Sequence, residues 1–383
     1  MTKQNDESLA LLLDVLKIDS VLGNETKVAE VLKKYFAEYG IDSRLLNFDF
    51  NRDQLIATID SGRTGKTLAL CGHMDVVRTG TDTWLHPPFS ATIVDGRIYG
   101  RGTSDMKSGL IAMAIAFVRF AQEIDSFNGK LQFIATVGEE SNSLGAAKLV
   151  SDGSLEKIDA MIIGEPTSNK LCLSHKGALW FKVTTSGKIS HGSMPELGIN
   201  AIERMLELIP KLKNLLNEMI EYDDILGETT WSINRMEGGE STNIVPDFCS
   251  VEVDMRILPN QNIEHLRQKI KNAIEEDFAK EFGFACKFDL INEKPPLSTN
   301  ESDDFVELTR SVLTDYTGME TEPVGLSIYT DASELIKDKH QYPIIVMGPG
   351  ETKLAHTTNE SVLIKEFYDA IDIYSHVINR YFN

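Results

Sequence analysis

The chain has 383 residues, of which 42% are apolar and 25% are charged, and its formal net charge is −20. This length is ample for two folded domains, and the composition is typical of a soluble globular protein. The acidic charge argues against nucleic acid and anionic membranes as partners, because both require a cationic surface. No segment resembles a signal peptide or a membrane span, so we expect a cytoplasmic protein.

The first 176 residues predict a layered α/β structure. Leucines at helical spacing indicate a helix over about Glu7–Ile18, and a second apolar stripe begins after Asn24, which we expect to cap that helix, and ends at Gly40. Apolar runs then alternate with helical patterns up to about Lys176, as in a sheet covered by helices.

From about Ala178 the pattern changes to β-α-β-β-α-β, the order of a ferredoxin-like unit. We therefore expect an inserted domain over 178–293 and a first domain over 1–177 and 294–383. The inserted elements are expected at Leu179–Thr185, Gly198–Met219, Thr229–Met236, Phe248–Ile257, Asn262–Ala279 and Phe284–Ile291. The returning chain predicts a helix over Asp303–Thr314, a buried strand over Pro343–Met347 and a closing helix over Ser361–Tyr381.

Side chains that can bind metal follow the predicted buried strands of the first domain. In open α/β sheets the ligand crevice lies outside the carboxyl ends of the strands, so we expect these side chains to converge. They are His73 and Asp75 after Thr67–Gly72, Glu139 and Glu140 after Lys130–Val137, Glu165 after Asp159–Gly164, and His356 after Tyr342–Gly348. Asp105 joins them from the turn before an apolar helix expected over Lys107–Gln122.

Imidazoles and carboxylates without a thiolate suit Zn²⁺, Mn²⁺ or Co²⁺. The four cysteines are scattered and form no Cys-x-x-Cys pair, so neither a disulfide framework nor a cysteine zinc site is indicated. We expect Asp105 to bridge two ions and Glu139 to act as the general base. Asp75 is expected to accept the imidazole N–H of His73 that faces away from the metal.

Two other classes of protein compete with this interpretation. The segment Asp60–Thr67 resembles a phosphate-binding loop, but Asp60 replaces the first glycine and a strand, not a helix, follows Lys66. A metal-free binding or regulatory protein could also use such a fold. Metal analysis distinguishes this metal-free protein from the enzyme, because the enzyme needs about two divalent ions per chain.

The motifs resemble the co-catalytic metallo-aminoacylase and carboxypeptidase family over nearly the whole chain. The matching segments are His73–Val77, Gly100–Gly109, Gly138–Glu140, Gly164–Thr167, Ser190–Ser193 and Gly348–Glu360. The resemblance implies a mixed-sheet zinc-hydrolase domain and an inserted dimerisation or lid domain. It also implies a homodimer with two Zn²⁺ per subunit.

The resemblance further assigns roles to single residues. One zinc would take His73, Asp105 and Glu165, and the other would take Asp105, Glu140 and His356. Glu139 would be the base. His191 would stabilise the tetrahedral oxyanion, often from the partner subunit.

Substrate binding is expected to need local cations. Arg256 can hold a carboxylate through two hydrogen bonds, and the resemblance supports Asn243 as its companion. Lys176 and Thr330 occupy further substrate-loop positions, although neighbouring residues depart from the motifs of proteobacterial desuccinylases. The implied substrate is an N-acyl amino acid: the family branch points first to succinyl-diaminopimelate, then to acetylornithine, then to a dipeptide or other peptide.

Overall fold

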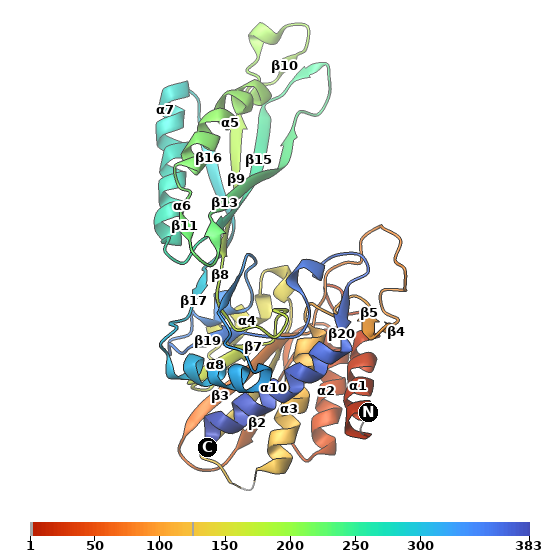
Figure 1. Ribbon diagram of the computed structural model, residues 1–383. Helices are drawn as coiled ribbons and strands as arrows, with labels where there is room; N and C mark the ends of the chain where they lie inside the picture. The colour runs from red at the N-terminus through yellow and green to blue at the C-terminus, as the bar shows by residue number, and fades with distance from the viewer. Residues whose placement is uncertain (1–2, 125) are drawn as a thin grey trace. The chain divides into compact units, whose positions relative to one another are not determined.

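The computed structural model describes residues 3–124 and 126–383, and the chain forms two compact units (Figure 1). The first unit comprises Met1–Leu173, Thr299–Val324 and Thr330–Asn383. The second comprises Ser174–Ser298 and Gly325–Tyr329, so it is inserted between parts of the first. Among the described residues, no helix is both long and apolar enough to cross a membrane.

The first unit is built on a mixed sheet in the order β1-β2-β6-β3-β7-β19, which continues through β8 to β17, with β18 beside β8. Strands β8 and β18 cross the boundaries between the units, and β17 lies in the residues of the second. Strands β6, β3, β7 and β19 run parallel, and β1, β2, β8 and β17 are antiparallel to their neighbours. The strands are β1 (Ser43–Asp49), β2 (Arg52–Asp60), β3 (Lys66–His73), β6 (Gly129–Thr136), β7 (Ala160–Ile163), β8 (Cys172–His175), β17 (Leu297–Ser298), β18 (Val324–Leu326) and β19 (Ile344–Val346). This is the mixed α/β architecture expected from the sequence.

Helices cover the sheet and bury its central strands. Helix α3 packs against α1, α10 and β3, and α2 packs against β2. The helices are α1 (Lys3–Leu16), α2 (Glu25–Glu38), α3 (Lys107–Glu123), α4 (Leu144–Ser151), α8 (Asp304–Thr317), α9 (Ala332–Leu335) and α10 (Ile364–Phe382). Since α3 is apolar on almost every side, it lies in the interior of this unit.

The second unit is a four-stranded antiparallel sheet in the order β13-β15-β9-β16. Its main elements are β9 (Gly177–Ser186), α5 (Ala201–Asn217), β13 (Thr230–Gly238), β15 (Phe248–Ile257), α6 (Ile263–Asn272), α7 (Ala279–Phe282) and β16 (Cys286–Lys294). Alternate residues of β9 and β15 share a buried cluster with α5 and α6. The order of elements and strands is that of a ferredoxin-like unit.

Two local expectations are wrong. Asn24 makes no side-chain cap for α2; its backbone is left-handed (φ 61°) and its amide donates to the Asp19 carbonyl instead. The closing helix does not begin at Ser361, because Ser361–Leu363 forms strand β20, which pairs with β5 (Arg97–Tyr99). Helix α10 therefore begins at Ile364.

Candidate metal centre

The predicted metal ligands of the first unit come together at one edge of its sheet. His73 is the last residue of β3 and pairs in register with Thr136, the last residue of β6. Glu165 follows the end of β7 after one glycine, and the turn that carries Glu139 and Glu140 follows β6. Because these strands are parallel, their carboxyl ends deliver the side chains to the same edge.

The ligand atoms form two groups that share Asp105. One oxygen of Asp105 lies 3.1 Å from His73 Nε2, which is 3.6 Å from Glu165 Oε1. The other oxygen lies 3.3 Å from His356 Nε2, which is 2.9 and 3.1 Å from the two oxygens of Glu140. His73, Asp105 and Glu140 each place one ligand atom within 4.8 Å of the others. The geometry therefore offers Asp105 as a carboxylate between two imidazoles.

Asp75 holds the turn that follows β6. Its two carboxylate oxygens accept the backbone N–H groups of Glu139 and Glu140, each at 3.1 Å. The His73 ring instead meets the backbone carbonyl of Asp75, at 2.9 Å from Nδ1, whereas the nearest carboxylate oxygen is 3.7 Å away. The expected contact is therefore replaced: the main chain orients the imidazole, and the side chain fixes the two glutamates.

Three carboxylates of this centre, those of Glu139, Glu140 and Glu165, resist ionisation. Burial, together with neighbouring carboxylates, raises the pKa of Glu139 and Glu165 well above the ordinary value and that of Glu140 to about 7. Burial also opposes ionisation of Asp105, but His356 and His73 hold its pKa below its usual range. A cation at this centre would favour the ionised form of all four carboxylates.

The imidazoles of His73 and His356 have raised pKa values, which favour their charged form. Burial alone would lower the pKa of His73, but Glu165, Asp105 and Asp75 raise it well above its ordinary value. Contacts with Asp105 and Glu140 raise the pKa of His356 to about 10. Within residues 3–124 and 126–383, no lysine or arginine pairs with Asp105, Glu140 or Glu165. A set of nitrogen and oxygen ligands with no other cationic partner fits divalent metal ions.

Thr330 lies in the first unit but is fully buried, and its hydroxyl accepts the backbone N–H of Ala332 at 3.1 Å. The neighbouring Asp331 is also buried and accepts a hydrogen bond from the Thr136 hydroxyl at 2.6 Å. Thr330 thus shapes the start of α9 (Ala332–Leu335). The contact with Ala332 uses an acceptor site of the hydroxyl and leaves its proton, so the role of Thr330 in substrate binding stays a prediction.

His191 and Asn243 lie close together in the second unit. His191 ends the short strand β10 (Ser190–His191), and Asn243 directly precedes the paired strand β14 (Ile244–Val245). The Gly192 N–H donates to the Asn243 carbonyl at 2.7 Å. His191 is exposed, and its Nδ1 accepts the backbone N–H of Ser193 at 3.1 Å. Since that nitrogen is an acceptor, the neutral ring carries its proton on Nε2, which can donate to a ligand.

Arg256 lies on β15 in a cluster with aromatic rings. Its Nε and Nη2 bind the two oxygens of Asp254 at 2.8 and 2.9 Å, and its guanidinium lies over the rings of Trp180 and Tyr329. The guanidinium is fixed in place by these contacts. Lys176 is buried, and its ammonium donates to the Glu228 carbonyl. Burial, and then the nearby Arg256, lower the pKa of Lys176.

Arg256 and Asn243 are not companions within one chain. Asn243 precedes the start of β15 at Phe248, whereas Arg256 is close to its end. Eight residues of extended strand separate Phe248 from Arg256, roughly 26 Å. One copy of the second unit therefore cannot bring both side chains to the same small carboxylate.

Two buried side chains near the centre were not assigned a role from the sequence. Arg101 and Glu360 form an ion pair, with Nη1 2.6 Å from Oε2, and both are almost fully buried. Arg101 lies in the motif Gly100–Gly109 and Glu360 in the motif Gly348–Glu360, so the sequence marked both positions as part of a functional motif. The pairing itself spans more than 250 residues of sequence and is visible only in the fold.

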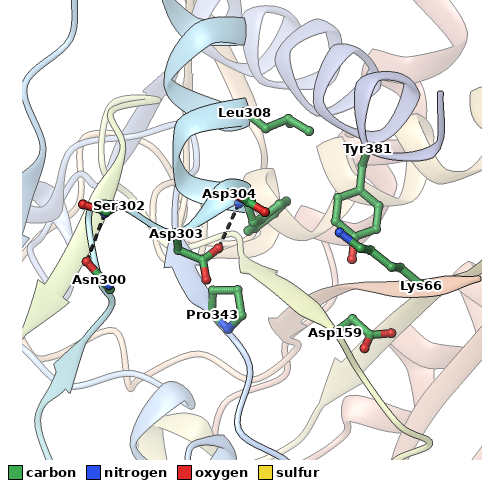
Figure 2. Close-up of a pocket in the computed structure, with 10 residues that line it drawn as sticks. Lys66, Asp159, Asn300, Ser302, Asp303, Asp304, Leu308, Pro343 and Tyr381 are labelled. Carbon is green, nitrogen blue, oxygen red and sulfur yellow. Dashed lines mark hydrogen bonds between the residues drawn. The ribbon is translucent and has the colours of Figure 1, made fainter.

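A pocket lies at the amino ends of the parallel strands, whereas the candidate metal centre lies at their carboxyl ends (Figure 2). The pocket has a volume of about 490 Å³ and includes Lys66 at the start of β3, Asp159 just before β7 and Pro343 just before β19. Its polar groups make local contacts: Asp159 accepts the Thr67 N–H, and Asp303 accepts the Phe305 N–H at the start of α8. None of the predicted site residues lines it.

Comparison with known proteins identifies relatives of the whole chain. The chain is 30% identical to a probable succinyl-diaminopimelate desuccinylase from Staphylococcus epidermidis, with 98% of each chain covered. It is also 30% identical to an acetylornithine deacetylase from Vibrio atlanticus, over 94% of this chain and 92% of the relative.

Solved structures agree at the level of the fold. A tripeptidase from Staphylococcus aureus matches with a TM-score of 0.77 and 25% identity, covering 99% of this chain and 97% of that one. A Bacillus subtilis protein described as a dinuclear metal binding peptidase from the M20 family matches with a TM-score of 0.73 and 17% identity, covering 99% of each chain. The model of peptidase family M20/M25/M40 matches residues 69–380, so the chain belongs to this family of metal-dependent hydrolases.

Proposed function

We propose that this hydrolase removes an N-acyl group from a carboxylate-bearing amino acid with two zinc ions per subunit, which cobalt or manganese can replace. The observation that carries the proposal is the pair of imidazole and carboxylate groups that share Asp105. The matching family and the description of the Bacillus subtilis protein support the two-ion count.

In this proposal His73, Asp105 and Glu165 hold one ion, and Asp105, Glu140 and His356 hold the other. When bound, such ions lower the pKa of a water and polarise the scissile carbonyl. Asp75 keeps Glu139 and Glu140 in their turn, so one glutamate serves the metal while its neighbour remains available for proton transfer.

Glu139 is the proposed general base. Its buried carboxylate has a raised pKa, which suits a group that must accept a proton near neutral pH and release it again. It takes a proton from the attacking water and passes it to the nitrogen of the leaving amine. His191, through Nε2–H, would donate to the oxyanion that develops on the scissile carbonyl.

The proposed substrate is N-succinyl-diaminopimelate. The support is the name of the Staphylococcus epidermidis relative, which matches over nearly the full length of both chains. Acetylornithine is the second candidate, from the Vibrio atlanticus relative. Peptides are third, because the Staphylococcus aureus structure is a tripeptidase. Arg256, fixed by Asp254, is proposed to bind a substrate carboxylate with Nη1, the nitrogen that Asp254 leaves open.

We also propose that residues 1–177 and 294–383 form the catalytic domain and that 178–293 form a dimerisation or lid domain. The distance between Arg256 and Asn243 along β15 favours a homodimer in which the two act from different subunits. His191 lies beside Asn243, so it would act from the same subunit as Asn243 and in trans to the metal ligands.

The test is an assay of zinc-loaded protein against N-succinyl-diaminopimelate, acetylornithine and a set of dipeptides and tripeptides. We expect about two divalent ions per chain by elemental analysis, and loss of activity on chelation that zinc restores. Preference for acetylornithine or a peptide would contradict the proposed substrate but leave the proposed metal-dependent amide hydrolysis in place. A protein that holds no metal and hydrolyses none of these compounds would instead fit a binding or regulatory role.

A further inference from the structure

The buried ion pair between Arg101 and Glu360 connects two turns that carry metal ligands. Arg101 belongs to the turn before α3 that also carries Asp105, and Glu360 follows the turn that carries His356. The two residues are 2% and 0% exposed. Such a pair is expensive to desolvate and is weak evidence for stability alone, so its contacts must explain its presence.

Glu360 holds the Asp105 side of the centre. One oxygen, Oε1, accepts the backbone N–H of Ser104 at 2.8 Å and the backbone N–H of Asp105 at 3.0 Å. The other oxygen, Oε2, takes Arg101 Nη1. The carboxylate therefore receives three donors and fixes the main chain of the residue that faces both imidazoles.

Arg101 holds the His356 side. Its Nη1 also donates to the Thr357 carbonyl at 3.3 Å, and its Nη2 donates to the carbonyls of His356 at 3.4 Å and Arg78 at 3.2 Å. The guanidinium lies over the Trp84 ring, 5.2 Å from its centroid. His356 itself has a left-handed backbone (φ 61°), so its turn needs external contacts to stay in place.

We propose that Arg101 and Glu360 are positioning residues that fix Asp105 and His356 at the separation needed to share a pair of divalent ions. The inference rests on the proposed metal function and extends it to residues that touch neither ion nor substrate. Partners that orient metal ligands from behind commonly change metal affinity or activity by about 10- to 100-fold when they are removed.

Glu360→Gln tests this with a small change in shape. An amide has one acceptor oxygen and one donor nitrogen, so it cannot accept from the Ser104 and Asp105 N–H groups and from Arg101 at the same time. Either Arg101 or the two backbone N–H groups must therefore lose a hydrogen-bond acceptor. We expect the zinc dissociation constant to rise at least about 10-fold and the absorption spectrum of the Co²⁺-loaded protein to change.

Asp372→Asn is the matched control. Asp372 pairs with Arg119 at 2.8 Å between α10 and α3, away from the ligand turns, and the substitution makes the same carboxylate-to-amide change. Its zinc affinity and cobalt spectrum should equal those of the unsubstituted protein. Urea unfolding of each metal-free variant reports any general loss of stability separately from metal binding.

Arg101→Lys tests the positioning role if Glu360→Gln fails to fold. Lysine keeps a charge for Glu360 but lacks the planar fork that reaches the carbonyls of His356, Thr357 and Arg78. Weaker zinc binding and an altered cobalt spectrum in the folded variant support the proposal. Unchanged affinity and spectrum in the folded variants overturn it, whereas an unsubstituted protein that takes up no divalent ion overturns the proposed function itself.

Discussion

Glu139 and Glu140 are adjacent in the sequence but have different surroundings. Both oxygens of Glu140 lie near His356 Nε2, at 2.9 and 3.1 Å. Among the described residues none donates a hydrogen bond to the Glu139 carboxylate, although its backbone N–H is held by Asp75. These surroundings support the proposed roles, with Glu140 as a metal ligand and Glu139 as the group that exchanges a proton.

Replacing each glutamate by glutamine should separate these roles. Glu139→Gln should retain both ions and lower kcat by at least about 10²-fold, because an amide cannot accept the proton. Glu140→Gln should lose metal, since an amide is a poorer ligand than a carboxylate. Elemental analysis and steady-state kinetics on the same preparations distinguish the two. Near-normal turnover in Glu139→Gln would remove this residue from the base role.

At the level of elements, the sequence predicted the strands β3, β6, β7 and β19 of the first unit and the edge where the parallel strands end. Buried parallel strands are nearly continuous apolar runs, so the polar residues that follow β3, β6 and β7 stand out. The contacts of Asp75 could not be predicted, because its carboxylate and its carbonyl both lie near His73 and only the turn geometry selects between them. The separation of Arg256 from Asn243 likewise depends on where β15 begins and ends.

A side chain at Gly138, in the turn after β6, should destabilise the protein. Its φ is +67°, and an added Cβ would lie 2.9 Å from Nη2 of Arg52, whose guanidinium is bound to the buried Glu25. Gly138→Ala should cost about 1 kcal/mol for the left-handed backbone alone, plus the displacement of Arg52 or of the turn. We expect lower kcat as well as lower stability, because Glu139 is the next residue.

Gly153→Ala is the control for this prediction. Gly153 has a similar φ of +62°, but no atom lies within 4 Å of the added Cβ. The Gly153→Ala variant should lose the stability expected for a left-handed backbone but keep its activity. Urea unfolding and kinetics of both variants give the comparison, and equal effects at the two positions would contradict the importance of the Arg52 contact.

For the whole molecule, the groups of the candidate metal centre should make the metal-free protein less stable as the pH rises from about 5 to 9. Burial lowers the pKa of His175 to about 4 and that of Lys107 to about 7, so these two groups oppose the trend. The folded pKa of Glu140, about 7, lies above its ordinary value, so the folded state holds more protons than the unfolded state between about pH 4.5 and 7. The same holds for His356 between about pH 6.5 and 10. Each excess proton gives a fall of up to about 1.4 kcal/mol per pH unit.

Divalent ions should remove this dependence, because they bind the deprotonated ligands in place of protons. Urea unfolding of chelated and zinc-loaded protein at several pH values measures the two slopes. The stabilisation by zinc should therefore grow with pH across this range. A stabilisation by zinc that does not grow between pH 5 and 9 would contradict the electrostatic description of the centre.

The homodimer proposal makes a reciprocal prediction for heterodimers purified with two different tags. A dimer that combines one His191→Ala subunit with one Glu139→Gln subunit should retain about half of the unsubstituted activity, because a two-fold dimer that acts in trans keeps one complete site. A dimer that combines an unsubstituted subunit with one carrying both substitutions should be inactive, since each site then lacks one group. If His191 acts within its own subunit, the two results exchange: the first heterodimer is inactive and the second retains about half.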